Sequence, residues 1–171
     1  MSGQSLALWL RVAAMTAFGW ATLAVPVSRP AATLAPGAAI ALGCAAGIAL
    51  FAVVARRVPC LTASGSPLPV TVAKHAFLGL WAVNEELVWR RLALGAALRG
   101  GPVAAVAASA VGFALFHRAR RGTHLVTGAA FGAVYVATGS LAAAVAAHWT
   151  YNGLVAVVVE RARAPTAEVS V

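Results

Sequence analysis

The sequence predicts an all-α protein: a polytopic bundle of about six transmembrane helices that forms one integral membrane domain over residues 1–171. Two observations lead to this fold class. Of the 171 residues, 61% are hydrophobic and only 10% are charged, whereas a soluble domain is about 25% charged and about 45–50% apolar. A chain this short cannot bury the excess apolar surface, because small domains leave much of their surface exposed. The composition therefore excludes an ordinary soluble enzyme and indicates that lipid surrounds most of the protein.

Six apolar runs account for these helices, since about 20 apolar residues cross a hydrocarbon core of about 30 Å. We interpret the first run as a retained helix and not as a cleavable signal peptide, because Arg11 interrupts it and no basic segment precedes it. Pro26 and Pro30 follow that run, and a Gly-Gly-Pro sequence ends the third. The runs cover about residues 6–25, 36–54, 70–98, 103–117, 123–138 and 141–159.

Glycines recur at a spacing of four within the apolar runs. Gly43 and Gly47 form one such pair, and Gly128 and Gly132 form another. Because this spacing lets two membrane helices approach closely, the pairs predict tight helix contacts without indicating a function.

The charge balance is strongly basic, with 13 Lys and Arg against 4 Asp and Glu and a net charge of +9. Arginines lie between the apolar runs, at positions 56, 57, 118, 120 and 121, and after the last run, at positions 161 and 163. This placement is typical of residues that orient a membrane protein, so the lipid bilayer is the expected partner and nucleic acid is not. The Ala- and Arg-rich composition fits a bacterium, so we expect the protein in the bacterial inner (cytoplasmic) membrane.

Two adjacent acids, Glu85 and Glu86, lie inside the third apolar run, although the chain has no Asp and only two other Glu residues. A charged side chain at the centre of a bilayer costs about 2.5–3.5 kcal/mol on insertion scales, so it indicates a function by default. Glu86 and Arg90 are spaced i,i+4 and can pair on one helix face. Glu85 points about 100° away from that pair and needs another partner. A structural ion pair explains one glutamate but not the second.

Polar partners are available on two later runs. His117 ends the fourth run, and His148 and Asn152 are spaced i,i+4 in the sixth. Other chemistries for hydrolysis within a membrane are absent from the sequence: there is no His-Glu-x-x-His zinc motif, no Asp for an aspartyl pair and no Gly-x-Ser-Gly for a serine nucleophile. The remaining candidate chemistry is that of glutamate with histidine.

These residues fit three ordered motifs. Residues 85–90 fit Glu-Glu-x-x-x-Arg, residues 113–117 fit Phe-x-x-x-His, and residues 148–152 fit His-x-x-x-Asn. In this order they resemble the motifs of the CPBP family of intramembrane proteases, which includes the CAAX prenyl endopeptidases and bacterial Abi-type proteins. One departure is Arg91, which stands where a glycine often follows the motif arginine. The catalytic core is expected over about residues 70–159.

The resemblance implies an intramembrane endopeptidase that hydrolyses a peptide bond of a membrane-associated protein substrate. Glu85 would be the general base, and His117 would help it to activate one water. A partly desolvated glutamate is well suited to this role. His148 and Asn152 would donate hydrogen bonds to the oxyanion. Glu86 and Arg90 would form a supporting ion pair, although the arginine could instead contact a substrate carboxylate.

The resemblance also leaves a zinc mechanism open. In that alternative Glu86 (or Glu85), His117 and His148 would form a His₂Glu site with an open position. We favour the glutamic mechanism, which needs no cofactor. Some bacterial relatives resemble myxosortase-type sorting enzymes, which remove a C-terminal hydrophobic anchor from surface proteins. The sequence makes no prediction about oligomeric state.

Two other function classes remain open. A non-enzymatic membrane scaffold, or a protein of the bacteriocin-immunity type, would keep the motif residues as a structural network, so that Glu85→Gln would spare its function. A small transporter would use Glu85 and Glu86 as a proton site, but the sequence contains no evident internal repeat.

The enzyme interpretation requires that the third or the fourth helix be long. If all six runs cross the membrane simply, Glu85 and His117 enter from opposite sides and lie at different depths. They meet only if the third helix is long and tilted, reaching about Leu98, or if the fourth extends through Arg121. We expect the long third helix, because residues 92–98 are mostly apolar.

Overall fold

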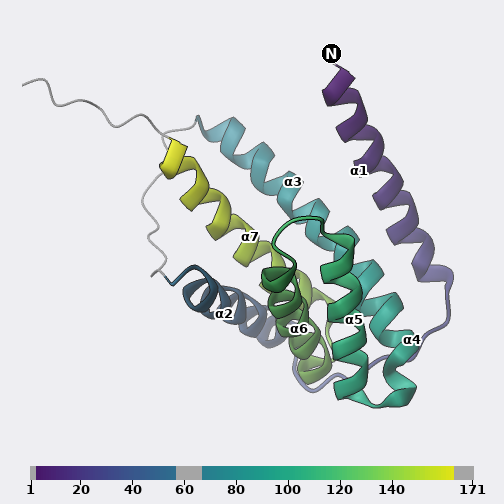
Figure 1. Cartoon of the computed structure of the whole chain (residues 1–171). Helices are drawn as coiled ribbons and strands as arrows, with labels where there is room; N and C mark the ends of the chain where they lie inside the picture. The colour runs from purple at the N-terminus through teal and green to yellow at the C-terminus, as the bar shows by residue number, and fades with distance from the viewer. Residues whose placement is uncertain (1–2, 57–66, 164–171) are drawn as a thin grey trace, which may run out of the picture.

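The structure is a computed structural model that describes residues 3–56 and 67–163 (Figure 1). Within these residues the chain forms six long helical segments and no strand, so the predicted all-α fold class is confirmed. A short 3₁₀ helix, η1 (Thr22–Ala24), follows the first helix. The long segments are α1 (Gly3–Ala21), α2 (Pro36–Ala55), a third segment that begins with α3 (Leu68–Glu86), α5 (Pro102–Phe116), α6 (Arg121–Thr138) and α7 (Leu141–Arg163).

The third segment is one continuous helix that changes type along its length. α3 continues into a π-helix, η2 (Leu87–Leu94), then into one α-helical turn, α4 (Gly95–Ala97), and a final 3₁₀ turn, η3 (Leu98–Gly100). The backbone stays helical where η2 begins and ends, with φ −68° and ψ −34° at Glu86 and φ −59° and ψ −38° at Gly95. The expected long third helix is therefore confirmed.

This length brings Glu85 and His117 to one level of the bundle. Gly101, with a positive φ of 97°, turns the chain before Pro102 starts α5. Glu85 lies 15 residues before the end of the third segment, and His117 lies 15 residues after the start of α5. Because the two segments run antiparallel from the turn, equal spacing places both side chains at a similar depth. α5 ends at Phe116, so no extension of the fourth helix is needed.

Two of the described helices are long and apolar enough to cross a membrane. They are α2, with a mean hydropathy of 2.4, and residues 141–159 of α7, with a mean hydropathy of 1.4. α1 also presents large apolar side chains outward, since Trp9, Phe18 and Trp20 are each more than half exposed. Exposed apolar area of this kind fits contact with lipid.

Glycines allow the closest helix contacts. A Cβ atom at Gly47 of α2 would lie 2.5 Å from the backbone oxygen of Ala147 in α7. Between α5 and α6, a Cβ atom at Gly128 would lie 3.0 Å from a ring carbon of Phe113. The tight helix contacts predicted from the glycine spacing are therefore present between α2 and α7 and between α5 and α6.

α1 is joined to the third segment by polar contacts. Asn84 Nδ2 of α3 donates to Thr16 Oγ1 of α1 at 2.8 Å. Arg91 of η2 is the residue that departs from the family pattern. Its guanidinium donates to three backbone carbonyls in and just after η1, those of Thr22, Leu23 and Val25. Carbonyls at a helix end have few partners within the helix, so the guanidinium supplies donors to them, sharing the Thr22 oxygen with the Val25 N–H, and ties η1 to the π-helix.

Candidate active site

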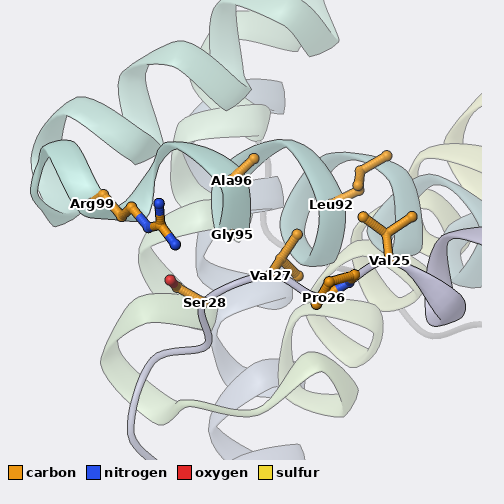
Figure 2. Close-up of a pocket in the computed structure, with 8 residues that line it drawn as sticks. All are labelled: Val25, Pro26, Val27, Ser28, Leu92, Gly95, Ala96 and Arg99. Carbon is orange, nitrogen blue, oxygen red and sulfur yellow. The ribbon is translucent and has the colours of Figure 1, made fainter.

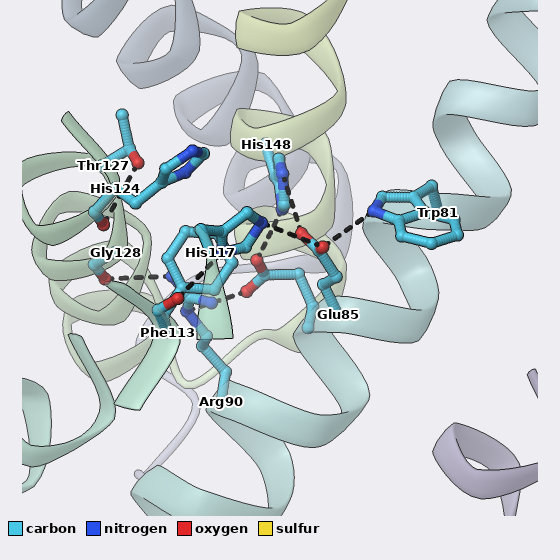
Figure 3. A network of polar contacts seen from close by, with 10 residues as sticks. Trp81, Glu85, Arg90, Phe113, His117, His124, Thr127, Gly128 and His148 are labelled. Atoms are coloured by element: carbon cyan, nitrogen blue, oxygen red, sulfur yellow. Dashed lines mark hydrogen bonds and ion pairs between the residues drawn. The ribbon is translucent and has the colours of Figure 1, made fainter. Parts of the chain in front are cut away.

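Glu85 lies at the end of α3, almost fully buried, and three helices direct polar groups towards it (Figure 3). Its Oε1 is 3.5 Å from His117 Nε2, and its Oε2 is 3.5 Å from His148 Nε2. Trp81, one turn earlier in α3, donates its indole N–H to Oε1 at 2.7 Å. The structure thus brings together three of the four residues expected to be catalytic around one carboxylate.

His117 is the first residue beyond α5 and has an extended backbone, with φ −93° and ψ 120°. Its Nδ1 lies 2.8 Å from the backbone oxygen of Phe113. Because a carbonyl only accepts hydrogen bonds, Nδ1 carries a proton, and Nε2 is the ring nitrogen that faces Glu85. At 3.5 Å, Nε2 and Glu85 Oε1 are farther apart than in a usual direct hydrogen bond, and one water can bind both.

His148 joins the two adjacent glutamates. Its Nδ1 lies 2.8 Å from Glu86 Oε1, while its Nε2 faces Glu85. Phe131 of α6 stacks on the imidazole, with ring centroids 4.6 Å apart and planes 18° apart. The ring is therefore held by a carboxylate along its edge and by an aromatic ring across its face.

Glu86 and Arg90 form a fully buried ion pair, with 3.1 Å between Arg90 Nε and Glu86 Oε2. The guanidinium also donates to the backbone oxygen of Gly128 at 3.0 Å. It lies over the rings of Phe113 and Phe131, at 4.9 Å and 5.5 Å from their centroids. Arg90 has no exposed surface and does not line the cavity, so its charge is directed to Glu86.

A cavity of about 250 Å³ opens onto this cluster. Asn152, half-buried and one helical turn after His148, lies in its wall, so all four residues expected to be catalytic share one cavity. The lining residues are Trp81, Glu85, Phe113, His117, Arg120, Thr123, His124, Thr127, Phe131, His148, Tyr151, Asn152 and Val155.

A larger cavity of about 500 Å³ lies between the 25–28 segment and the far half of the third helical segment (Figure 2). Arg99 is the one ionisable side chain in its wall, and no carboxylate or imidazole lines it. It lacks the groups needed to activate water, so the candidate active site is the smaller cavity. The residues lining the larger cavity are Val25, Pro26, Val27, Ser28, Leu92, Gly95, Ala96 and Arg99.

Residues 66–154 match the family described as Type II CAAX prenyl endopeptidase Rce1-like, and this match covers just over half of the chain. The chain belongs to this family. Membership identifies it as one of a family of membrane-embedded endopeptidases, and the matched residues contain all three motifs. Neither a curated protein nor a solved structure matches the chain.

The residues of this family member do not fit the zinc set that uses Glu86. One oxygen of Glu86 faces His148 Nδ1 and the other faces Arg90, so neither is directed into the cavity with His117. The alternative zinc set uses Glu85, whose two oxygens each lie 3.5 Å from one imidazole, His117 Nε2 and His148 Nε2.

Three residues of the site were not among the expected functional residues. Trp81 could have been found from its spacing, because it is one turn before Glu85 on the same helix face. His124 lies in the first turn of α6 and stacks on His117, with centroids 3.9 Å apart and planes 18° apart. Phe131 stacks on His148. No local pattern identifies these two residues, since their partners are on other helices.

Proposed function

We propose that the protein is an intramembrane endopeptidase of glutamic type, which cleaves a membrane-associated protein substrate with a water activated by Glu85 and His117. One observation carries the proposal. A buried carboxylate faces two imidazole Nε2 atoms, each at 3.5 Å, in a cavity within a helix bundle that is mostly apolar. A bundle that needed only packing would not retain this group, because a buried charge is costly.

The first step is attack by water. A water bound between Glu85 Oε1 and His117 Nε2 gives a proton to the carboxylate while its oxygen bonds to the peptide carbonyl carbon. The tetrahedral intermediate then collapses with cleavage of the C–N bond, and Glu85 returns the proton to the leaving nitrogen. Water is consumed, an acid and an amine are released, and no covalent enzyme intermediate forms. General base catalysis of this kind contributes about 10²–10⁴ in rate.

The oxyanion is stabilised by the α7 residues. His148 Nδ1 lies against Glu86, so the oxyanion would accept from Nε2–H of the doubly protonated ring. Asn152, one turn further along, offers a second donor from its amide. Loss of one such donor costs about 10²–10³ in rate.

The substrate class follows from the cavity's position. A cavity inside an apolar bundle is reached by a peptide that is itself at or in the membrane, and removal of a C-terminal hydrophobic anchor, as in myxosortase-type sorting, is one reaction of this class. The bacterial inner membrane remains the proposed location.

Cleavage in cells tests the proposal. Tagged candidate membrane proteins from the same genome are co-expressed with the wild type, with Glu85→Gln and with His148→Ala. The matched control is Arg99→Met, an ionisable residue in the wall of the other cavity. A shortened product that the wild type and the control produce and the two site variants do not would support the protease. Equal cleavage in all four would refute it, and preserved function in Glu85→Gln without any cleavage would favour the scaffold alternative.

A further inference from the structure

We propose that Trp81 is a positioning residue for Glu85: its indole N–H holds the carboxylate in the orientation that the water-activation step requires. This inference rests on the proposed function. Trp81 is half-buried and lines the cavity, and its Nε1 lies 2.7 Å from Glu85 Oε1. It is not part of any of the three motifs that identify the family.

The carboxylate of Glu85 needs such a contact. The terminal torsion of a glutamate side chain is broad, so the two oxygens can rotate between roughly equivalent orientations. The two imidazoles lie at 3.5 Å, which is longer than the usual 2.7–3.2 Å of a protein hydrogen bond. The indole N–H is the closest polar contact among those described for Glu85. It fixes Oε1 on the side of His117 and leaves Oε2 facing His148.

Trp81 is itself held by aromatic contacts that reach α1. The ring of Phe77 stacks on that of Trp81, with centroids 6.2 Å apart and planes 24° apart. Trp9 of α1 meets Phe77 edge-on, with centroids 6.4 Å apart. α1 lies outside the residues that match the family. The N-terminal helix, for which the motifs give no role, therefore braces the indole that positions the base.

The sharpest test removes the donor and keeps the ring. Trp81 is replaced in the full chain by 3-benzothienylalanine, in which sulfur takes the place of the indole N–H, and separately by Phe. A hydrogen bond to a charged group contributes enough that we expect kcat to fall roughly ten- to hundredfold in both. KM on a cleavable membrane peptide should change by less than about twofold, because the donor acts on the base and not on substrate binding.

Trp149 supplies the matched control, because its indole N–H also bonds across helices, to the backbone oxygen of His75 at 2.9 Å, and it does not line the cavity. Trp149→Phe should leave kcat within about threefold of the wild type. An unchanged kcat in the benzothienyl variant, or an equal fall in Trp149→Phe, would overturn the positioning role. A folded wild type that cleaves no substrate would instead contradict the proposed function.

A second measurement does not depend on activity. Indole ¹⁵N–¹H resonances of the detergent-solubilised full chain are assigned with the Trp81→Phe and Trp149→Phe variants. Glu85→Ala should shift the Trp81 indole resonance, since its acceptor is removed, and should leave that of Trp149 in place. If the Trp81 indole resonance does not shift in Glu85→Ala, the hydrogen bond is not formed in solution, and the inference is overturned.

Discussion

The imidazole of His148 lies between two adjacent glutamates, with Nδ1 2.8 Å from Glu86 Oε1 and Nε2 3.5 Å from Glu85 Oε2. This relationship gives the neighbouring acids separate tasks. Glu86, with Arg90 on its other oxygen, sets the orientation of the histidine from within the protein, whereas Glu85 faces the cavity. Carboxylates that fix a histidine through one ring nitrogen leave the other nitrogen free for chemistry.

The oxyanion donors give the first prediction. His148→Ala and Asn152→Ala should each lower kcat by about 10²–10³, because each removes one proposed donor to the tetrahedral intermediate. Single-turnover cleavage of a membrane peptide by purified protein measures the effect. The double variant should lose less than the product of the two factors, since residues that act as a unit are not additive. If kcat of the double variant falls by the full product of the two factors, His148 and Asn152 have independent roles.

The buried ion pair gives the second prediction. Arg90→Met should destabilise the fold by about 3–5 kcal/mol, because it leaves the buried carboxylate of Glu86 without its compensating charge. Unfolding in mixed detergent micelles, followed by far-ultraviolet circular dichroism, measures this. Arg99→Met is the control, since Arg99 is exposed at the other cavity. Similar midpoints for the two variants would show that Glu86 does not depend on Arg90.

Metal removal gives the third prediction. Treatment with 1,10-phenanthroline, followed by gel filtration into metal-free buffer, should leave at least about half of the cleavage rate, as expected for a base that is a carboxylate and not a metal-bound water. Metal content measured by mass spectrometry on the same sample provides the control. Loss of activity on chelation and its return with added zinc would replace the glutamic mechanism with a metal-dependent one.

The contact between α2 and α7 gives the fourth prediction. Gly47→Leu should destabilise the protein by about 1–3 kcal/mol or more, because a side chain there meets the backbone of Ala147 and forces the helices apart. Gly37→Leu is matched to it in the same helix, since a Cβ atom at Gly37 meets nothing within 4 Å. The two variants are compared by thermal unfolding in detergent. Equal melting temperatures would show that the close approach is not required.

The fold class and the main members of the site follow from local information. Composition indicates a helical membrane protein, and the i,i+4 spacings of Glu86 with Arg90 and of His148 with Asn152 place each pair on one helix face, because helical periodicity is a property of the sequence. The length of the third segment also follows, since its apolar character continues to Leu98.

Tertiary structure decided the rest. The packing of the third segment against α6 and α7 determines which ring nitrogen of His148 meets which glutamate. The same packing places Phe131 on that ring and keeps Arg90 out of the cavity. The attachment of α1 through Arg91 and Trp9 is likewise a contact between residues far apart in the chain. Periodicity orients a side chain relative to its own helix axis, and only packing between helices determines what that side chain meets.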